Sequence, residues 1–304
     1  MARTPLFCKP FLSLCLQALL LCTWPAAQAA SPQTPLPLTP LPTDPAGLAA
    51  ALSRVEAALR HGATHASDQQ ELSHLQQRLY RRLGRNRGLA LAVRRMLPQE
   101  LRAAYDLHIN ARQALEAMVP PGRPPLATVP AWRIIQPASA EALLASYRRA
   151  AAATGVPWQV LAAVNLVETG LGRLDGISVA NAQGPMQFLP STWAEPGIGR
   201  GNIHDPDDAI QAAARYLVRR GARQDLRRGL WGYNNSAHYG RAVLQYAALL
   251  RTQPEAFRAL YHWQVHLRTI AGDLWLPVGT QLTRPMAVAE FVRLRPWSRS
   301  DGPP

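Results

Sequence analysis

The chain has 304 residues, of which 48% are hydrophobic and 17% charged, and this composition excludes a wholly disordered, collagen-like or coiled-coil protein. Lysine and arginine number 33 against 19 aspartates and glutamates, which gives a formal net charge of +14, and Lys9 is the only lysine. The positive charge is therefore almost entirely arginine, whose planar guanidinium group suits carboxylate and phosphate partners.

Residues 1–29 have the pattern of an export signal peptide. Arg3 and Lys9 give a positive start, an apolar stretch follows, and residues 27–29 read Ala-Gln-Ala, the form of a cleavage site. The apolar stretch is short for a membrane span. Cleavage here would remove all the cysteines, so we expect an exported mature protein without disulfides. Lipid attachment at Cys22 and a retained anchor are the alternatives.

Residues 30–45 are rich in proline, threonine and serine and predict an extended tether. Residues 46–118 predict a small N-terminal helical region, because leucines recur there at helical spacing. Ser67 with Gln70 predicts a capping box at the start of its second helix. We find no constellation of catalytic side chains in this region.

Residues 119–131 are rich in proline and predict a linker. Residues 132–250 follow as a second helical region with clear boundaries. Ser139 and Asp205 are residue types that cap helix N-termini. Gly170 is expected to end the helix that begins after Pro157 and runs through Glu168.

The last segment, residues 251–304, predicts a C-terminal extension that begins helical and turns extended through residues 274–278. Repeats are absent from the sequence, and alternation of apolar and polar residues is rare elsewhere. The fold class predicted for the chain is therefore all-α.

Glu168 is the first candidate for chemistry. It follows an almost wholly apolar segment, residues 160–167, at the end of a predicted helix. Desolvation there would favour the protonated carboxylic acid, which is the form that a general acid needs. The alternative is an ordinary solvated or salt-bridged glutamate at a helix end.

Two further segments follow Glu168-Thr169 along the chain. Residues 184–193 read Gly-Pro-Met-Gln-Phe-Leu-Pro-Ser-Thr-Trp, and Tyr233-Asn234 precedes another predicted helix. Each alone is compatible with a simple turn. Together, in this order, they resemble the catalytic region of the exported bacterial lytic murein transglycosylases with a lysozyme-like, SLT-type domain. The resemblance covers roughly residues 132–250. Asn181 departs from it, because glycine is common at that position.

The resemblance implies a lysozyme-like helical catalytic domain, preceded by a small helical region and followed by a short extended segment. It also implies cleavage of the β-1,4 bond between N-acetylmuramic acid and N-acetylglucosamine in peptidoglycan. The product would carry 1,6-anhydro-N-acetylmuramic acid, formed without water. Glu168 would be the single catalytic acid and base. Tyr233 would help to position its carboxyl group. The residues expected to bind substrate are Thr169, Ser178, Met186, Gln187, Tyr233 and Asn234.

Two other functions remain open at this stage. A lysozyme-type hydrolase would use Glu168 together with Asp175, since hydrolytic glycosidases use two carboxyl groups. A non-catalytic peptidoglycan-binding protein would keep the cleft without the reaction. His204, beside Asp205 and Asp207, could suggest a metal site, but a helix N-terminus explains the two acids better. We therefore expect no metal and no other cofactor.

Arginines gather at residues 81–95 and 219–228 and predict basic surfaces, part of which are solvated helix faces. Because the chain has an export signal and no nucleic-acid motif, we expect peptidoglycan glycan strands as the partner, and no nucleic acid. The predicted location is the cell envelope, periplasmic or extracellular, with membrane proximity only through export. A monomer is assumed.

Overall fold

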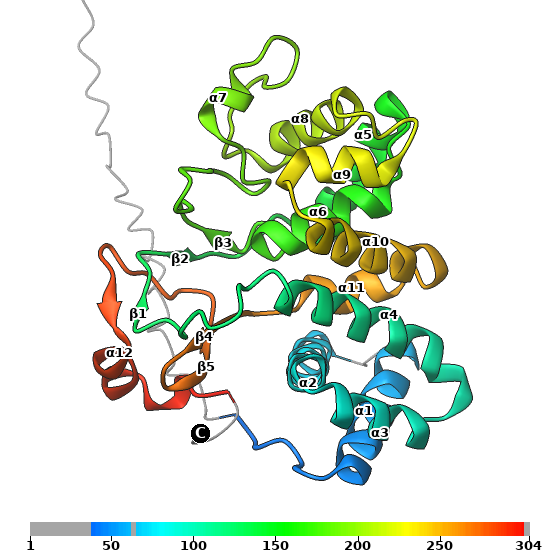
Figure 1. The fold of residues 1–304 in the computed structure, drawn as a ribbon, viewed down its shortest axis with the longest axis vertical. Coiled ribbons are helices and arrows are strands. Elements are labelled where there is room, and N and C mark those ends of the chain that lie inside the picture. The colour runs from blue at the N-terminus through cyan, green and yellow to red at the C-terminus, as the bar shows by residue number, and fades with distance from the viewer. Residues whose placement is uncertain (1–37, 62–64, 301–304) are drawn as a thin grey trace, which may run out of the picture. The chain divides into compact units, whose positions relative to one another are not determined.

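Helices make up most of the chain in the computed structural model, which describes residues 38–61 and 65–300 (Figure 1). The helices are α1 (Pro45–His61), α2 (Ala66–Arg85), α3 (Arg87–Met96), α4 (Gln99–Glu116), α5 (Ala140–Thr154), α6 (Trp158–Thr169), α7 (Pro190–Trp193), α8 (Pro206–Arg219), α9 (Leu226–Asn234), α10 (Ala237–Thr252), α11 (Ala256–Tyr261) and α12 (Val288–Leu294), with a 3-10 turn at Pro296–Ser298. This confirms the predicted all-α class. The predicted signal peptide, residues 1–29, lies outside the described residues. No helix within them is both long and apolar enough to cross a membrane.

Short antiparallel strand pairs join distant parts of the chain. The strands are β1 (Thr128–Val129), β2 (Arg133–Ile134), β3 (Leu174–Asp175), β4 (Val265–Thr269), β5 (Gly272–Leu276) and β6 (Met286–Ala287). β4 and β5 form a hairpin, β1 pairs with β6, and β2 pairs with β3. The predicted linker thus contributes a strand that pairs with the C-terminal segment.

Local capping residues set the helix boundaries around the central helices. The Ser139 side chain accepts a hydrogen bond from the first turn of α5, and Asp205 does the same for α8, as predicted. The capping box predicted at Ser67 is wrong. His65 precedes α2 and provides no side-chain cap. Ser67 lies inside the first turn of α2, and the Ser67 hydroxyl donates a hydrogen bond to the Asp68 carboxylate.

One apolar core contains side chains from both predicted helical regions. Leu52 of α1, Tyr80 of α2, Leu161 of α6 and Tyr246 of α10 all belong to it. α10 packs along α4 on one side and α6 on the other, and α5 and α8 also contact α6 (Figure 1). Leu41, from the segment predicted as a tether, is buried in the same core.

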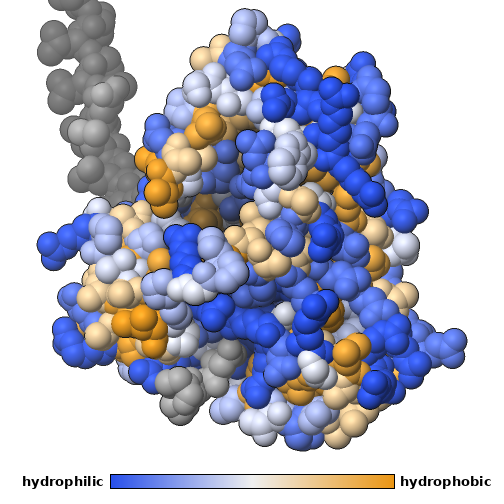
Figure 2. Space-filling model, viewed as in Figure 1, coloured by the Kyte–Doolittle hydropathy of each residue, from blue (hydrophilic) through white to orange (hydrophobic). Residues whose placement is uncertain are grey.

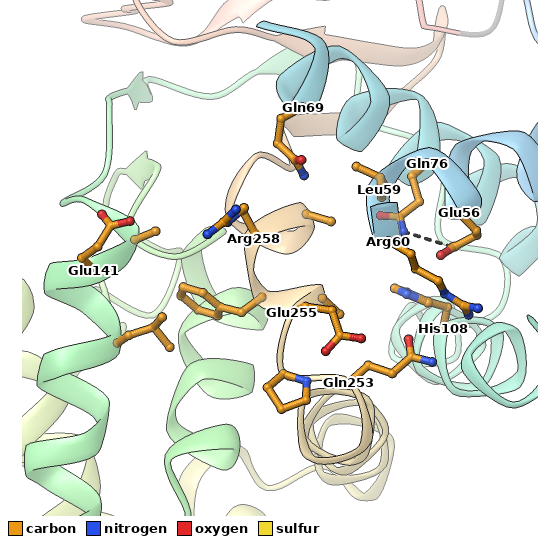
Figure 3. A pocket seen from close by; sticks show the side chains of 16 residues that line it. Glu56, Leu59, Arg60, Gln69, Gln76, His108, Glu141, Gln253, Glu255 and Arg258 are labelled. Carbon is orange, nitrogen blue, oxygen red and sulfur yellow. Dashed lines mark hydrogen bonds between the residues drawn. The ribbon is translucent and has the colours of Figure 1, made fainter. Parts of the chain in front are cut away.

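A polar network connects α1, α2 and the segment after α11. Oε1 of Glu56 accepts hydrogen bonds from the Tyr80 hydroxyl at 2.7 Å and from the Gln76 amide at 3.0 Å, the latter drawn in Figure 3. The Trp263 indole N–H donates to Gln76 at 3.1 Å. Burial raises the pKa of Glu56. A cavity of about 310 Å³ borders this network and is lined in addition by His108.

Asp273 of β5 forms a buried ion-pair cluster with α2. Arg81 donates to both of its carboxylate oxygens, at 2.8 and 2.7 Å, and Arg85 donates to one at 2.9 Å. Burial alone would raise the pKa of Asp273, but the charge and hydrogen bonds of Arg81 outweigh it and hold that pKa well below its usual range. Arg81 and Arg85 were predicted to contribute to a basic surface. The structure instead uses them to join the C-terminal hairpin to α2.

We predict that Asp273→Asn lowers the free energy of unfolding by about 3–5 kcal/mol, because it leaves the buried Arg81 guanidinium group without its carboxylate and leaves Arg85 only its longer contact to Glu116. Asp106→Asn is the matched control, since the Arg94 and Asp106 side chains are 41% and 37% exposed and their pair should contribute about 1 kcal/mol or less. Urea unfolding followed by circular dichroism measures both. Equal losses in the two variants would contradict the role given to Asp273.

Candidate active site

Glu168 lies in the last turn of α6, where the apolar core meets the surface. Residues 160–165 of this helix are all buried, whereas the Glu168 side chain is half-buried. Gly170 adopts a left-handed conformation, with a φ of 62°, and ends the helix directly after Thr169. The sequence therefore fixes this carboxyl group at the rim of the core.

The Glu168 carboxyl group accepts a hydrogen bond from the Tyr239 hydroxyl at 2.7 Å. Burial raises the pKa of Glu168 to about 7, and the hydrogen bond from Tyr239, which favours the carboxylate, opposes that rise. A carboxyl group with a pKa near 7 can donate a proton at neutral pH and then take one back. The pair thus has the properties required of a general acid that later acts as a base.

Sequence reasoning missed Tyr239, which comes from α10. Ser236 caps this helix, and its hydroxyl oxygen accepts a hydrogen bond from the Tyr239 backbone N–H at 3.2 Å. Tyr239 is therefore on the first turn, with a side chain that is only 1% exposed. The capping serine was the available signal for this placement. The sequence contained no signal that this turn faces α6.

Tyr233, which the resemblance expects to help position the carboxyl group, makes no direct hydrogen bond to Glu168 among the described residues. Its hydroxyl donates to the backbone carbonyl oxygen of Met186 at 2.7 Å. Its ring stacks on that of Tyr239, with ring centroids 6.2 Å apart and an interplanar angle of 3°. Tyr233 therefore connects the 184–188 loop to the tyrosine that contacts Glu168.

Thr169 and Met186 lie behind the surface of the site. The Thr169 hydroxyl donates to the Pro185 carbonyl oxygen at 2.6 Å, and the Asn165 amide donates to the same oxygen at 2.7 Å. Thr169 is 2% exposed and Met186 is fully buried. Thr169 supports the 184–188 loop from beneath, and Met186 anchors the loop in the apolar core. Both side chains therefore have little surface for the substrate contacts that the resemblance implied.

The loop before this segment has its own supports. The Ser178 hydroxyl oxygen accepts a hydrogen bond from the Ala182 N–H at 2.9 Å. Asn181 has a φ of 65°, a left-handed conformation that asparagine adopts more easily than most residues, so glycine is not required there. Glycine is required at residue 184, where φ is 72° and a Cβ atom would collide with the Ile203 carbonyl oxygen.

Gln187 and Asn234 are the two amide side chains that the resemblance expects to bind substrate, and they differ in exposure. Gln187 is half-buried, and its side-chain amide donates to the Gly184 carbonyl oxygen at 3.1 Å. Asn234 is exposed at the end of α9. Within the described ranges, neither side chain hydrogen-bonds to Glu168. Figure 2 shows that this face of the molecule is hollowed between the α7 region and the β2–β3 pair.

Asp175 belongs to a cross-strand ion pair. It lies opposite Arg133 in the β2–β3 pair, and Nε of Arg133 donates to its carboxylate at 2.9 Å. In the part of the chain that the structure describes, Asp175 makes no hydrogen bond to Glu168 or Tyr239. The structure therefore does not bring the two carboxyl groups of the hydrolase alternative into one network.

The acidic residues after His204 stabilise a helix start and an ion pair. Asp205 accepts a hydrogen bond from the Asp208 N–H at 3.0 Å, and Asp207 pairs with Arg149 at 2.7 Å. Across residues 38–61 and 65–300, the structure contains no group of three histidine, cysteine, aspartate or glutamate side chains that could hold a metal ion.

Comparison with known proteins identifies the region that contains this site. The family model described as "Transglycosylase SLT domain" matches residues 146–249, from within α5 to the last turns of α10. This stretch includes Glu168, the 184–193 segment, Tyr233 and Tyr239. No curated protein and no solved structure gave a significant match. Residues 146–249 thus form a transglycosylase SLT domain, which supports the resemblance to the lytic murein transglycosylases with a lysozyme-like catalytic domain.

Proposed function

We propose that the chain cleaves the β-1,4 bond between N-acetylmuramic acid and N-acetylglucosamine and closes a 1,6-anhydro ring, with Glu168 as the single acid and base. The SLT domain indicates peptidoglycan cleavage of the lytic transglycosylase type in general. The observation that best supports the finer proposal is the Glu168 carboxyl group, half-buried, hydrogen-bonded by Tyr239 and with a pKa near 7.

The proposed reaction begins with proton transfer from Glu168 to the oxygen that links the two sugars. The bond from this oxygen to the muramic C1 then breaks, and the substrate's own acetamido group can stabilise the resulting positive charge. Glu168, now a carboxylate, takes the proton of the muramic C6 hydroxyl. The C6 oxygen then attacks C1 and closes the 1,6-anhydro ring. Glu168 ends the cycle protonated, and no water is consumed.

Gln187 and Asn234 are the proposed contacts to sugar and N-acetyl groups, because their amides can both donate and accept hydrogen bonds. Ser178, Thr169 and Met186 are proposed to act by holding the loops that carry these contacts. Tyr239 is proposed as a positioning residue, since it touches the carboxyl group that reacts.

Two observations weigh against the alternatives. A hydrolase needs a second carboxylate to activate water, and Asp175 is engaged by Arg133. A binding protein has no use for a desolvated carboxyl group, which costs stability when it ionises. We also propose that the chain acts in the cell envelope after export, on glycan strands.

We predict that Glu168→Gln lowers the turnover of purified peptidoglycan by about 10²–10⁴-fold, because the amide cannot donate and recover the proton. Mass analysis of the released muropeptides measures it. Glu141→Gln, on the exposed first turn of α5, is the control for a lost carboxyl group and should keep wild-type rates. A folded Glu168→Gln protein that retains most activity would overturn the assignment.

We predict that Tyr239→Phe shifts the alkaline limb of the kcat/KM profile upward. The wild-type rate should fall above pH 7 as Glu168 loses its proton. Removing a hydrogen bond that favours the carboxylate raises the pKa of Glu168 further, so the fall begins at higher pH. The maximum should drop by about 10-fold or more, because the carboxyl group loses its fixed orientation. Tyr233→Phe, which keeps the Tyr239–Glu168 bond, should leave the position of the limb unchanged.

We predict that Asp175→Asn keeps most of the activity and still yields anhydromuropeptides. A hydrolase would instead give products heavier by one water and would lose activity as severely as Glu168→Gln. Arg133→Gln breaks the same ion pair from the other side and serves as the stability control. An Asp175→Asn protein with the melting temperature of Arg133→Gln but without activity would refute the one-carboxylate mechanism.

A further inference from the structure

Five arginines line a groove of about 800 Å³ between α4 and α10. They come from five separate segments: the end of α2, the start of α3, the loop after α4, the first turns of α10, and β4. We call this the arginine groove, and its arginines are Arg85, Arg87, Arg123, Arg241 and Arg268. Convergence from so many segments makes the groove a property of the fold rather than of one charged stretch of sequence.

The groove has an excess of positive charge that the protein itself does not neutralise. Its one carboxylate, Glu116, already lies within ion-pair distance of Arg85 at 3.4 Å, Arg112 at 3.2 Å and Arg268 at 3.7 Å. Arg87, Arg123 and Arg241 are exposed and form no ion pair with any carboxylate of the described residues. Three guanidinium groups are therefore available to an oxyanion from outside.

His238 also lines the groove, and its Nδ1 is buried without a hydrogen-bond partner among the described atoms. A buried nitrogen of this kind is costly unless something bonds to it. Because this nitrogen is buried, the exposed arginines are the contacts that the groove offers to a ligand.

The arginine groove and the catalytic pair share α10. Tyr239 of this helix contacts Glu168, whereas His238 and Arg241 of the same helix line the groove. A second hollow, lined by Trp231 and Ser236, shares Arg241 with the groove. Trp231 is 52% exposed. A continuous surface therefore leads from the end of α9, where Asn234 lies, along α10 into the groove.

We propose that the arginine groove binds the carboxylates of the stem peptides on peptidoglycan strands, a contact separate from the sugars held near Glu168. The inference rests on the proposed function. Stem peptides branch from the muramic residue that reacts, so they leave the catalytic site along with the glycan. Arginine binds carboxylates through paired hydrogen bonds. A wide, open and polar groove fits a flexible acidic peptide better than a compact apolar ligand.

The test uses the mature protein with Arg87, Arg123 and Arg241 all changed to glutamine. The matched control changes Arg148, Arg251 and Arg293, which are exposed on α5, α10 and α12 away from the groove and lose the same charge. Each protein is assayed on peptidoglycan strands with intact stems and on strands from which an amidase has removed them. Melting temperatures verify folding.

We expect the groove variant to raise KM for stem-bearing strands by about 10-fold or more, with kcat little changed, because each lost exposed contact contributes modestly to binding. Its KM for stem-free strands should equal that of the wild type, and the control should match the wild type on both. The stem-dependent difference should shrink at about 0.5 M salt, where exposed charges are screened.

Three outcomes would overturn the inference. The KM of the groove variant could rise equally for stem-bearing and stem-free strands, or it could rise for neither. The groove variant could also keep wild-type KM for stem-bearing strands while losing affinity for a phosphate-bearing wall polymer, which would assign the groove to phosphate oxyanions. Failure of the proposed function is distinguishable from all three, because the wild type would then release no anhydromuropeptides from stem-free strands.

Discussion

α6 is apolar on nearly every side, and the arrangement around the site follows from this. A helix without a polar face must be covered on all sides. α5, α8 and α10 contact it, and α10 in turn packs on α4 of the N-terminal region. The helix ends at Gly170, and Glu168 lies half-buried in the last turn, which follows six buried residues. The position of the carboxyl group is therefore a result of core packing as much as of the motif around it.

Two opposing effects act on that carboxyl group. Desolvation favours its neutral form, and the Tyr239 hydroxyl favours its charged form. Tyr233 stacks on Tyr239 and bonds to the Met186 backbone, so the 184–188 loop and the tyrosine pair form one connected support. This connection gives a physical reason for the sequence motifs: Gly184 permits the close approach of the loop to Ile203, and Tyr233 fixes the loop against α10.

Features that depend on neighbouring residues could be predicted from the sequence. Ser139, Asp205 and Gly170 define helix ends through local hydrogen bonds and backbone conformation, and the prediction of each was confirmed. Features that depend on distant partners could not. The Tyr239–Glu168 bond joins two separate helices. The sequence does not distinguish an arginine that faces water from one that pairs with a buried carboxylate of a distant segment. Arg81 was therefore predicted to lie on a basic surface.

The Asp273 cluster has a consequence for the order of folding. Arg81 obtains its carboxylate only when residue 273 has been made and the hairpin has docked, and such long-range contacts form slowly. A growing chain that has passed residue 250 contains the whole SLT domain but still lacks the carboxylate that pairs with Arg81. The cluster thus ties the end of α2 to one of the last segments of the chain to be made, so the joint between the N-terminal helices and the C-terminal hairpin forms only after all residues of the SLT domain are present.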